Sequence, residues 1–336
     1  MFENTHFPKA KKFWHMGKLY EWSQPNIHAM SHALHYGTSV FEGIRAYNTE
    51  KGSAVFRLPE HIDRFIHSAT TLYMEVPYSK EEMIKAIKLV IRENNLESAY
   101  IRPVLFYAYG KLGLVPKYSP VELTIGAWEW GAYLGDKTEK GVRVCIVPWR
   151  RIHPSQLEMT AKLGGIYVQS AICGMLARSK GFDEAIFLNL EGNVAEGPGE
   201  NIFIVKKGII TTNDKTESVL EGITQSSLLE VAKDLGYKIK IGPIAKEDFF
   251  KADEAFFSGK AVEIAPIIQV SDCSSLKAEN KEYTIGSGKA GDITLRLAEA
   301  YKDIVTGKYK KYEKWLTHVN EHRVPSLFTN CDLRHG

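Results

Sequence analysis

One lysine, Lys162, stands among small residues directly before a segment with helical apolar spacing. We interpret Gly164 and Gly165, which follow it, as clearance for a flat ring beside the lysine amine. An amine with space around it can form an imine with an aldehyde, which is the chemistry of pyridoxal phosphate enzymes. A solvated lysine in front of a helix fits the same residues, and this motif alone does not separate the two interpretations.

A carboxylate, Glu196, lies in a glycine-rich turn, residues 195–201, between two predicted strands. Against the ring nitrogen of pyridoxal phosphate, such an acid would keep the ring protonated and able to accept electrons. An ordinary turn residue is the competing interpretation. Lys162 and Glu196 together support the hypothesis of a cofactor site more than either does alone.

Two turns could hold an anion such as a phosphate. Ile223 and Thr224 stand at the start of a predicted helix, 225–235, where free amides and the helix dipole favour negative charge. Thr224 could instead simply cap that helix. The second turn, 258–263, contains Lys260.

Two arginines have ambiguous positions. Arg64 falls opposite the apolar stripe of a helix that begins near Pro59, and its spacing alone favours a solvated side chain. Arg102 alternates with Tyr100 on one face of a predicted strand, 99–109. It is either an anion receptor or a structural ion-pair partner.

The composition favours a cytoplasmic enzyme. The 336 residues are 44% hydrophobic and 25% charged with a net charge of +3, enough for two domains. Lysines and arginines are dispersed, so no nucleic-acid partner is expected. No apolar run approaches the ~20 residues of a membrane helix and no signal peptide opens the chain, so no membrane partner is expected. The four cysteines form no Cys-x-x-Cys pair, so no metal site or disulfide framework is indicated.

The elements that must position these residues follow from periodicity. Residues 30–47 favour a buried loop feeding a strand, and Ser79 with Glu82 predicts a capping box. We predict a hairpin at 13–22, strands at 54–57, 99–109, 121–128, 142–147, 185–190, 201–205, 209–212 and 253–257, and helices from Pro59, from Ser79, after Gly165, at 225–235 and at 293–305. Residues after 320 look poorly ordered.

Six motifs in this order resemble the class IV aminotransferases, most closely the branched-chain amino acid aminotransferases. They occupy residues 35–45, 100–103, 130–133, 161–167, 196–201 and 222–224, and the resemblance runs from about residue 10 to 320. It implies the α+β or α/β two-domain fold of fold type IV pyridoxal phosphate enzymes. A small N-terminal α/β domain at 1–129 and a linker at 130–140 would precede a larger pseudo-barrel domain at 141–320 and a tail at 321–336.

The resemblance also implies a role for each matching residue. Lys162 would hold pyridoxal 5′-phosphate as an imine and carry the proton between Cα and C4′. Tyr167 would bind the ring O3′ and Glu196 the ring nitrogen. The phosphate would be held by Arg64, Ile223, Thr224 and Lys260.

The implied reaction exchanges amino groups between leucine, isoleucine or valine and 2-oxoglutarate. The α-carboxylate would meet Tyr100 and the amides of Lys260 and Ala261, and Arg102 would bind glutamate's second carboxylate. The aliphatic side chain would lie among Phe41, Trp130, Tyr133 and Tyr167, with Tyr36 and Leu114 from a neighbouring subunit. A homodimer is expected, with a hexamer possible.

Two residues depart from the family pattern. Lys260 stands where a threonine is usual, and Ile166 where many members have asparagine. Lys260 could serve the phosphate as a point charge or point away to solvent. Other fold type IV enzymes, namely D-amino acid or R-selective amine transaminases and aminodeoxychorismate lyase, would use the same lysine and glutamate. A catalytically silent relative is a further alternative.

Overall fold

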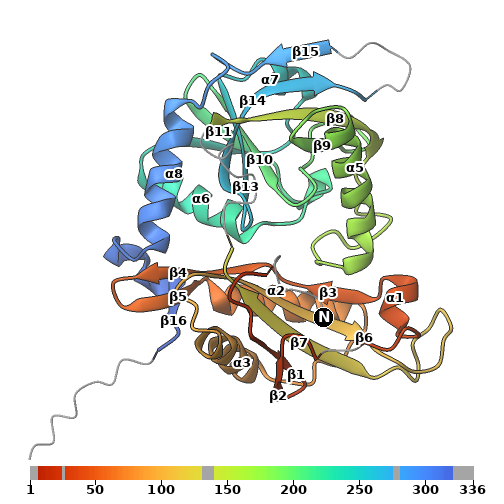
Figure 1. Cartoon of the computed structure of the whole chain (residues 1–336). Helices are drawn as coiled ribbons and strands as arrows, with labels where there is room; N and C mark the ends of the chain where they lie inside the picture. The colour runs from red at the N-terminus through yellow and green to blue at the C-terminus, as the bar shows by residue number, and fades with distance from the viewer. Residues whose placement is uncertain (1–6, 25–26, 131–139, 275–280, 321–336) are drawn as a thin grey trace, which may run out of the picture.

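Two sheets, one above the other in Figure 1, make up the protein. The structure is a computed structural model, and it describes residues 7–24, 27–130, 140–274 and 281–320. Within this part of the chain each sheet has eight strands, ordered β16-β5-β4-β6-β7-β1-β2 with β3 beside β6, and β12-β11-β10-β13-β14-β8-β9 with β15 beside β14. The first sheet is antiparallel, whereas the second also contains the parallel pairs β11 with β12, β14 with β8 and β8 with β9.

The first sheet comes mainly from the N-terminal part of the chain. Its elements are β1 (Lys12–His15), β2 (Lys18–Glu21), α1 (His32–Tyr36), β3 (Ser39–Phe41), β4 (Ile44–Thr49), β5 (Gly52–Phe56), α2 (Leu58–Thr71), α3 (Lys80–Glu93), β6 (Ala99–Tyr107) and β7 (Val121–Trp128). Helix α2 buries Ile62, Phe65 and Ala69, as its stripe predicts. The capping box of Ser79 and Glu82 is confirmed at the start of α3.

The second sheet carries helices α5, α6 and α8 (Figure 1). Its elements are β8 (Val142–Arg150), α5 (Tyr167–Ser179), β9 (Glu184–Leu188), β10 (Asn201–Lys206), β11 (Ile209–Thr212), α6 (Ile223–Asp234), β12 (Lys238–Ile241), α7 (Lys246–Phe250), β13 (Glu254–Gly259), β14 (Glu263–Asp272), β15 (Lys281–Thr284) and α8 (Asp292–Val305). Strand β16 (Leu316–His318) then returns to the first sheet and pairs with β5. Of the linker predicted at 130–140, residues 131–139 lie outside the described residues, as does the tail at 321–336.

Three local predictions are wrong. Residues 32–36 form a short helix, α1, instead of a loop, and Gly37 ends it in a left-handed conformation. Tyr73 is 92% exposed, because α2 ends at Thr71 and the chain turns away with a positive φ at Tyr73. Helix α6 begins at Ile223 with Gly222 as its N-cap, so Thr224 lies inside the first turn and does not cap it.

Helix α5 turns its apolar stripe outward. Val168 and Met175 are 64% and 63% exposed, whereas the helix packs on its sheet through Ser170, Cys173 and Ala177. Sequence periodicity identifies an apolar face but not the surface that covers it. No helix in the described parts of the chain is long and apolar enough to cross a membrane.

Candidate active site

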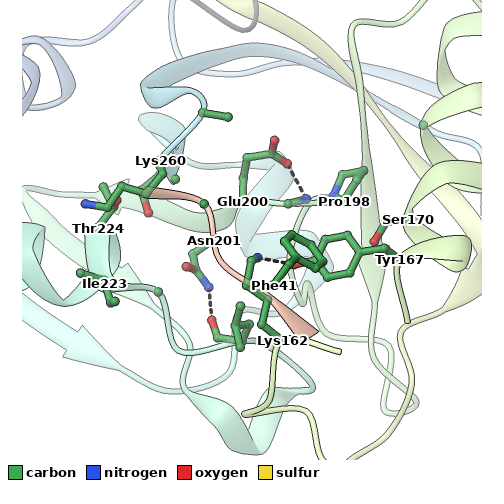
Figure 2. A pocket seen from close by; sticks show the side chains of 18 of the residues that line it. Phe41, Lys162, Tyr167, Ser170, Pro198, Glu200, Asn201, Ile223, Thr224 and Lys260 are labelled. Carbon is green, nitrogen blue, oxygen red and sulfur yellow. Dashed lines mark hydrogen bonds between the residues drawn. The ribbon is translucent and has the colours of Figure 1, made fainter. Parts of the chain in front are cut away.

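A cavity of about 500 Å³ lies where the two sheets meet (Figure 2). Two hydrogen bonds connect the Lys162 segment to the elements of the first sheet around the cavity. Phe41 N donates to Lys162 O at 3.3 Å, and Lys162 N donates to Ser68 Oγ at 2.8 Å. The cavity is lined by most of the predicted site residues: Phe41, Arg64, Tyr100, Arg102, Lys162, Tyr167, Ile223, Thr224, Lys260 and Ala261.

The Lys162 amine points into this cavity. Its Nζ donates a hydrogen bond to Tyr167 Oη and lies 4.9 Å from the centroid of the Phe41 ring (Figure 2). The lysine precedes the short 3₁₀ turn Gly164–Ile166, which leads into α5. The structure therefore places an amine and a phenol in direct contact in the cavity.

The glycines after Lys162 allow close packing of this segment, and their role in clearing space for a ring stays a prediction. A Cβ on Gly164 would lie 2.2 Å from Ser39 Oγ. A Cβ on Gly37 would lie 2.8 Å from Gly165 Cα. Both glycines therefore allow the Lys162 segment to approach β3 and the end of α1 closely.

Behind the cavity wall, Glu196 is fixed by two donors. Arg151 Nε donates to its Oε1 at 2.8 Å and Leu220 N to its Oε2 at 3.0 Å, while Arg151 Nη1 also donates to Ser170 Oγ at 3.2 Å. Burial raises the pKa of Glu196, and Arg151 and Leu220 oppose this shift. Leu220 and Ser170 line the cavity, so the Arg151–Glu196 pair lies directly beneath its surface.

Arg64 is not solvated, contrary to its helical spacing. Its Nε and Nη2 donate to the two oxygens of the fully buried Glu42 at 2.6 and 2.9 Å, and its Nη1 donates to Glu221 O at 3.0 Å. Burial would raise the pKa of Glu42, but Arg64 and His61 outweigh it and hold that pKa well below its usual range. The bidentate pair fixes the guanidinium plane at the edge of the cavity.

One end of the cavity has donors without acceptors. Ile223, Thr224 and Lys260 gather there in Figure 2. The side-chain oxygens of Thr224 and Ser258 and the Nζ of Lys260 are buried and lack a hydrogen-bond partner among the described residues. The first turn of α6 adds free main-chain amides. Buried polar groups normally have partners, so these groups fit a bound anion such as a phosphate ester.

Opposite this end, Arg102 lies among aromatic rings. Its Nη2 donates to Tyr100 Oη at 2.7 Å, and its Cζ lies 4.6 Å from the centroid of the Phe41 ring. Gly43 is required here, because a Cβ on it would lie 2.3 Å from Tyr100 Oη. Trp130 stacks on Tyr100 with ring centroids 4.7 Å apart but does not itself line the cavity.

Two further predicted substrate residues lie outside the cavity. Tyr36 and Leu114 are exposed, Leu114 by 82%, and neither lines it. Both were expected from a neighbouring subunit, and their contribution to a substrate site stays a prediction. Tyr133 lies outside the described residues.

Sequence reasoning missed four residues of the site: Glu42, His61, Arg151 and Glu200. Glu42 and Glu200 lie inside the motifs at residues 35–45 and 196–201, and this position could have identified them as site residues. Nothing in the sequence marked His61 or Arg151, whose partners are distant along the chain. Burial, together with the nearby Glu184, raises the pKa of Glu200 to about 8, which favours the protonated carboxyl group in the cavity wall.

Comparisons with known proteins agree on one family. The family model for class IV amino-transferases matches residues 39–270. The branched-chain-amino-acid aminotransferase of Pseudomonas aeruginosa is 42% identical over 91% of this chain and 96% of its own, and that of Escherichia coli K12 is 40% identical over 93% and 99%. A crystal structure of the T.th. branched-chain amino acid aminotransferase with pyridoxamine 5′-phosphate superposes with a TM-score of 0.86 at 43% identity, covering 93% of this chain and all of that one.

Because His61 is buried, we predict that part of the protein's loss of stability in mild acid depends on this histidine. Burial, opposed by Glu42, lowers the pKa of His61 to about 3. In the unfolded chain this histidine takes a proton near pH 6.5, so the unfolded state binds more protons and stability falls as the pH falls. Between pH 6 and 5, His61→Asn should reduce the pH slope of the unfolding free energy by on the order of 1 kcal/mol per pH unit.

Urea unfolding at several pH values measures this slope. His67, which is exposed and bonded only to Thr160 Oγ1, offers the matched control, and His67→Asn should keep the wild-type slope. Equal slopes for His61→Asn and the wild type would show that His61 is not held neutral.

Proposed function

Because the chain belongs to the class IV aminotransferase family, we propose that it is a branched-chain amino acid aminotransferase that uses pyridoxal 5′-phosphate. It exchanges amino groups between leucine, isoleucine or valine and 2-oxoglutarate. The observation that carries this function is the Lys162 amine in contact with Tyr167, in a cavity with unpaired anion donors at one end. Cytoplasmic location stays a prediction from the sequence.

When bound, pyridoxal 5′-phosphate supplies an aldehyde for covalent attachment and a ring that accepts the electron pair released at Cα. Lys162 is the residue for that attachment, and its amine, once free, takes and returns the proton at the substrate Cα. A free lysine with a pKa near ~10.4 is mostly protonated, so a neutral amine must be maintained by its surroundings. The Tyr167 hydroxyl contacts Lys162 Nζ and orients it.

Glu196 would accept a hydrogen bond from the ring nitrogen of the bound cofactor. Each carboxylate oxygen has a second lone pair, so the bonds to Arg151 and Leu220 leave capacity for one more donor. Arg151 opposes the effect of burial and so favours the ionised carboxylate. The first turn of α6 would hold the phosphate, and Arg64, whose guanidinium is already fixed by Glu42, would add a positive charge there.

The substrate pocket must accept an aliphatic chain and a second carboxylate in turn. Phe41 and Tyr167 supply aromatic surface, worth of order ~2 kcal/mol for a buried aliphatic side chain. Arg102 pairs with glutamate's second carboxylate, and Tyr100 with the amides of Lys260 and Ala261 binds the α-carboxylate. Arg102 stacks on Phe41, so one residue serves the polar substrate while its neighbour serves the apolar one.

We also propose that two copies of the chain associate through one apolar face. This face is formed by exposed apolar side chains: Leu34 and Tyr36 on α1, Leu114 and Val115 in the loop between β6 and β7, and Val168, Ile172 and Met175 on α5. The segments touch one another, since Gly37 after α1 packs on Gly165 before α5, and His32 bonds Gly113 O at 2.6 Å. A second copy would bring Tyr36 and Leu114 to its neighbour's cavity.

Single-turnover reactions test the function. The purified protein should be yellow and should convert L-leucine, L-isoleucine, L-valine and L-glutamate, but not the D-amino acids, when absorbance is followed. Lys162→Ala should lose about 10³-fold or more in rate, because the positioned base is gone. It should also lose the adduct that borohydride fixes to the chain. Tyr167→Phe should keep that adduct, and an active, borohydride-sensitive Lys162→Ala protein would refute the assignment.

Arg102 should discriminate between the two substrates. In Arg102→Met the aliphatic stem still packs on Phe41 while the charge is lost, so the glutamate reaction should slow by about 10²-fold, as expected for removing a buried charge partner. The leucine reaction should change only a few-fold. Single-turnover rates at several substrate concentrations measure both. Equal losses for leucine and glutamate would count against the assignment.

The association of two copies predicts a mass near twice 37.9 kDa in light scattering. Ile172→Asp places a charge on the proposed face and should yield single chains, because an unpaired buried charge is costly. Leu295→Asp is the matched control, since Leu295 is exposed on α8, on the opposite side of the molecule in Figure 1. A dimeric Ile172→Asp protein would place the contact elsewhere.

A further inference from the structure

Lys260 occupies an unusual position for a lysine. It follows β13 in the turn that leads to β14, and its Nζ is buried, without a hydrogen-bond partner among the described residues, 4.0 Å from the centroid of the Phe56 ring. A lysine in a surface turn ordinarily extends its amine into water. Here the side chain points inward, toward the same end of the cavity as Thr224 (Figure 2).

The charges around Lys260 are mostly positive or already paired. Arg57 and Arg64 approach it from α2 and disfavour its ammonium form. Glu42 attracts it, but both oxygens of Glu42 are taken by Arg64 and His61. This amine is therefore in a cationic environment without a free acceptor.

The remaining neighbours do not change this balance. Glu263 at the start of β14 attracts the amine, but it is ion-paired with Arg45 at 3.1 Å. Burial raises the pKa of Tyr301, on α8, well above its usual value, so this phenol stays neutral. Burial, reinforced by Arg57 and Arg64, lowers the pKa of Lys260 well below its usual value. The burial of Nζ without a hydrogen-bond partner among the described residues, together with the two nearby guanidinium groups, favours the uncharged amine while no anion is bound.

We propose that Lys260 is a proton-coupled anchor for the cofactor phosphate: the amine takes one proton from solvent as the anion enters and then donates to it. The lone pair of Nζ forms the new N–H bond, and water or buffer gives up the proton. The dianionic phosphate supplies the acceptor and the negative charge that this site otherwise lacks. The inference rests on the proposed function and assigns this chain a binding step that a threonine at position 260 could not perform.

Calorimetry with pyridoxamine 5′-phosphate tests the proposal without any turnover. This ligand carries the phosphate but forms no imine with Lys162, so proton exchange at that lysine is separated from the effect sought. Titrations of cofactor-free protein at pH 8 in buffers of different ionisation enthalpy should show about one more proton taken up by the wild type than by Lys260→Met. From pH 9 to pH 8 the wild-type Kd should fall by up to ~10-fold relative to the variant.

Two controls make the result specific. Lys260→Thr restores the hydroxyl usual in the family and should recover part of the affinity without the extra proton. It also serves as the comparison if Lys260→Met does not fold. Pyridoxamine without its phosphate should give the same proton number for all three proteins.

The outcomes separate this inference from the proposed function. Equal proton uptake by the wild type and both variants, with pyridoxamine 5′-phosphate bound, overturns the role of Lys260 alone. Extra uptake with phosphate-free pyridoxamine overturns it as well. A wild-type protein that neither binds pyridoxamine 5′-phosphate nor converts amino acids overturns the function, and this inference with it.

Discussion

The buried ion pair between Glu42 and Arg64 is the interaction on which the cavity depends. A carboxylate with no exposure to solvent is tolerated only when its charge is compensated, and here two nitrogens of Arg64 and one of His61 bond to its oxygens. The same arginine bonds Glu221 O on the segment that leads into α6. One carboxylate therefore fixes both the charge at the cavity edge and the segment before the anion-binding helix. Removing it would leave a poorly placed guanidinium between the two sheets.

The cavity also requires close approach of main chains from the two sheets. Lys162 reaches its position because Gly164 lets the chain pass against Ser39, and Tyr100 fits because Gly43 has no side chain. A methyl group at either glycine would overlap a neighbouring oxygen. Packing thus gives a reason for Gly164, which from the sequence was interpreted as clearance for a ligand. The distinction matters for variants, since changes at these glycines would disturb the protein before any ligand binds.

Periodicity predicted most of the elements because each sheet buries one face and each amphipathic helix covers it. The capping box at Ser79 and the stripe of α2 are local patterns, and they are confirmed. The environment of Arg64 could not be predicted, because its partner is set by tertiary packing of β3 against α2. The exposure of the apolar stripe of α5 could not be predicted for a related reason, because an apolar pattern does not show whether the surface that covers it belongs to the same chain.

For the site itself, recognised motifs located the cavity-lining residues but not the groups that hold them. Glu196 was found as a candidate, whereas the Arg151 that bonds it was not, because the pair forms between segments 45 residues apart. Residues that contact a ligand need particular chemical groups, so a sequence motif can identify them. Residues that only support them need a suitable charge, size and side-chain orientation, which many different sequences provide.

Polar groups that have a partner and polar groups that lack one have different roles in this cavity. Glu42 with Arg64 and Glu196 with Arg151 are satisfied without a ligand, so they hold their geometry and lose little freedom when one binds. The side-chain polar atoms of Thr224, Ser258 and Lys260 have no hydrogen-bond partner among the described residues, and an anion that accepts from them would relieve the cost of their burial. An apolar molecule bound at this end of the cavity would leave these polar groups without hydrogen-bond partners. Selectivity for a phosphate-bearing ligand thus follows from which polar groups the fold leaves without partners.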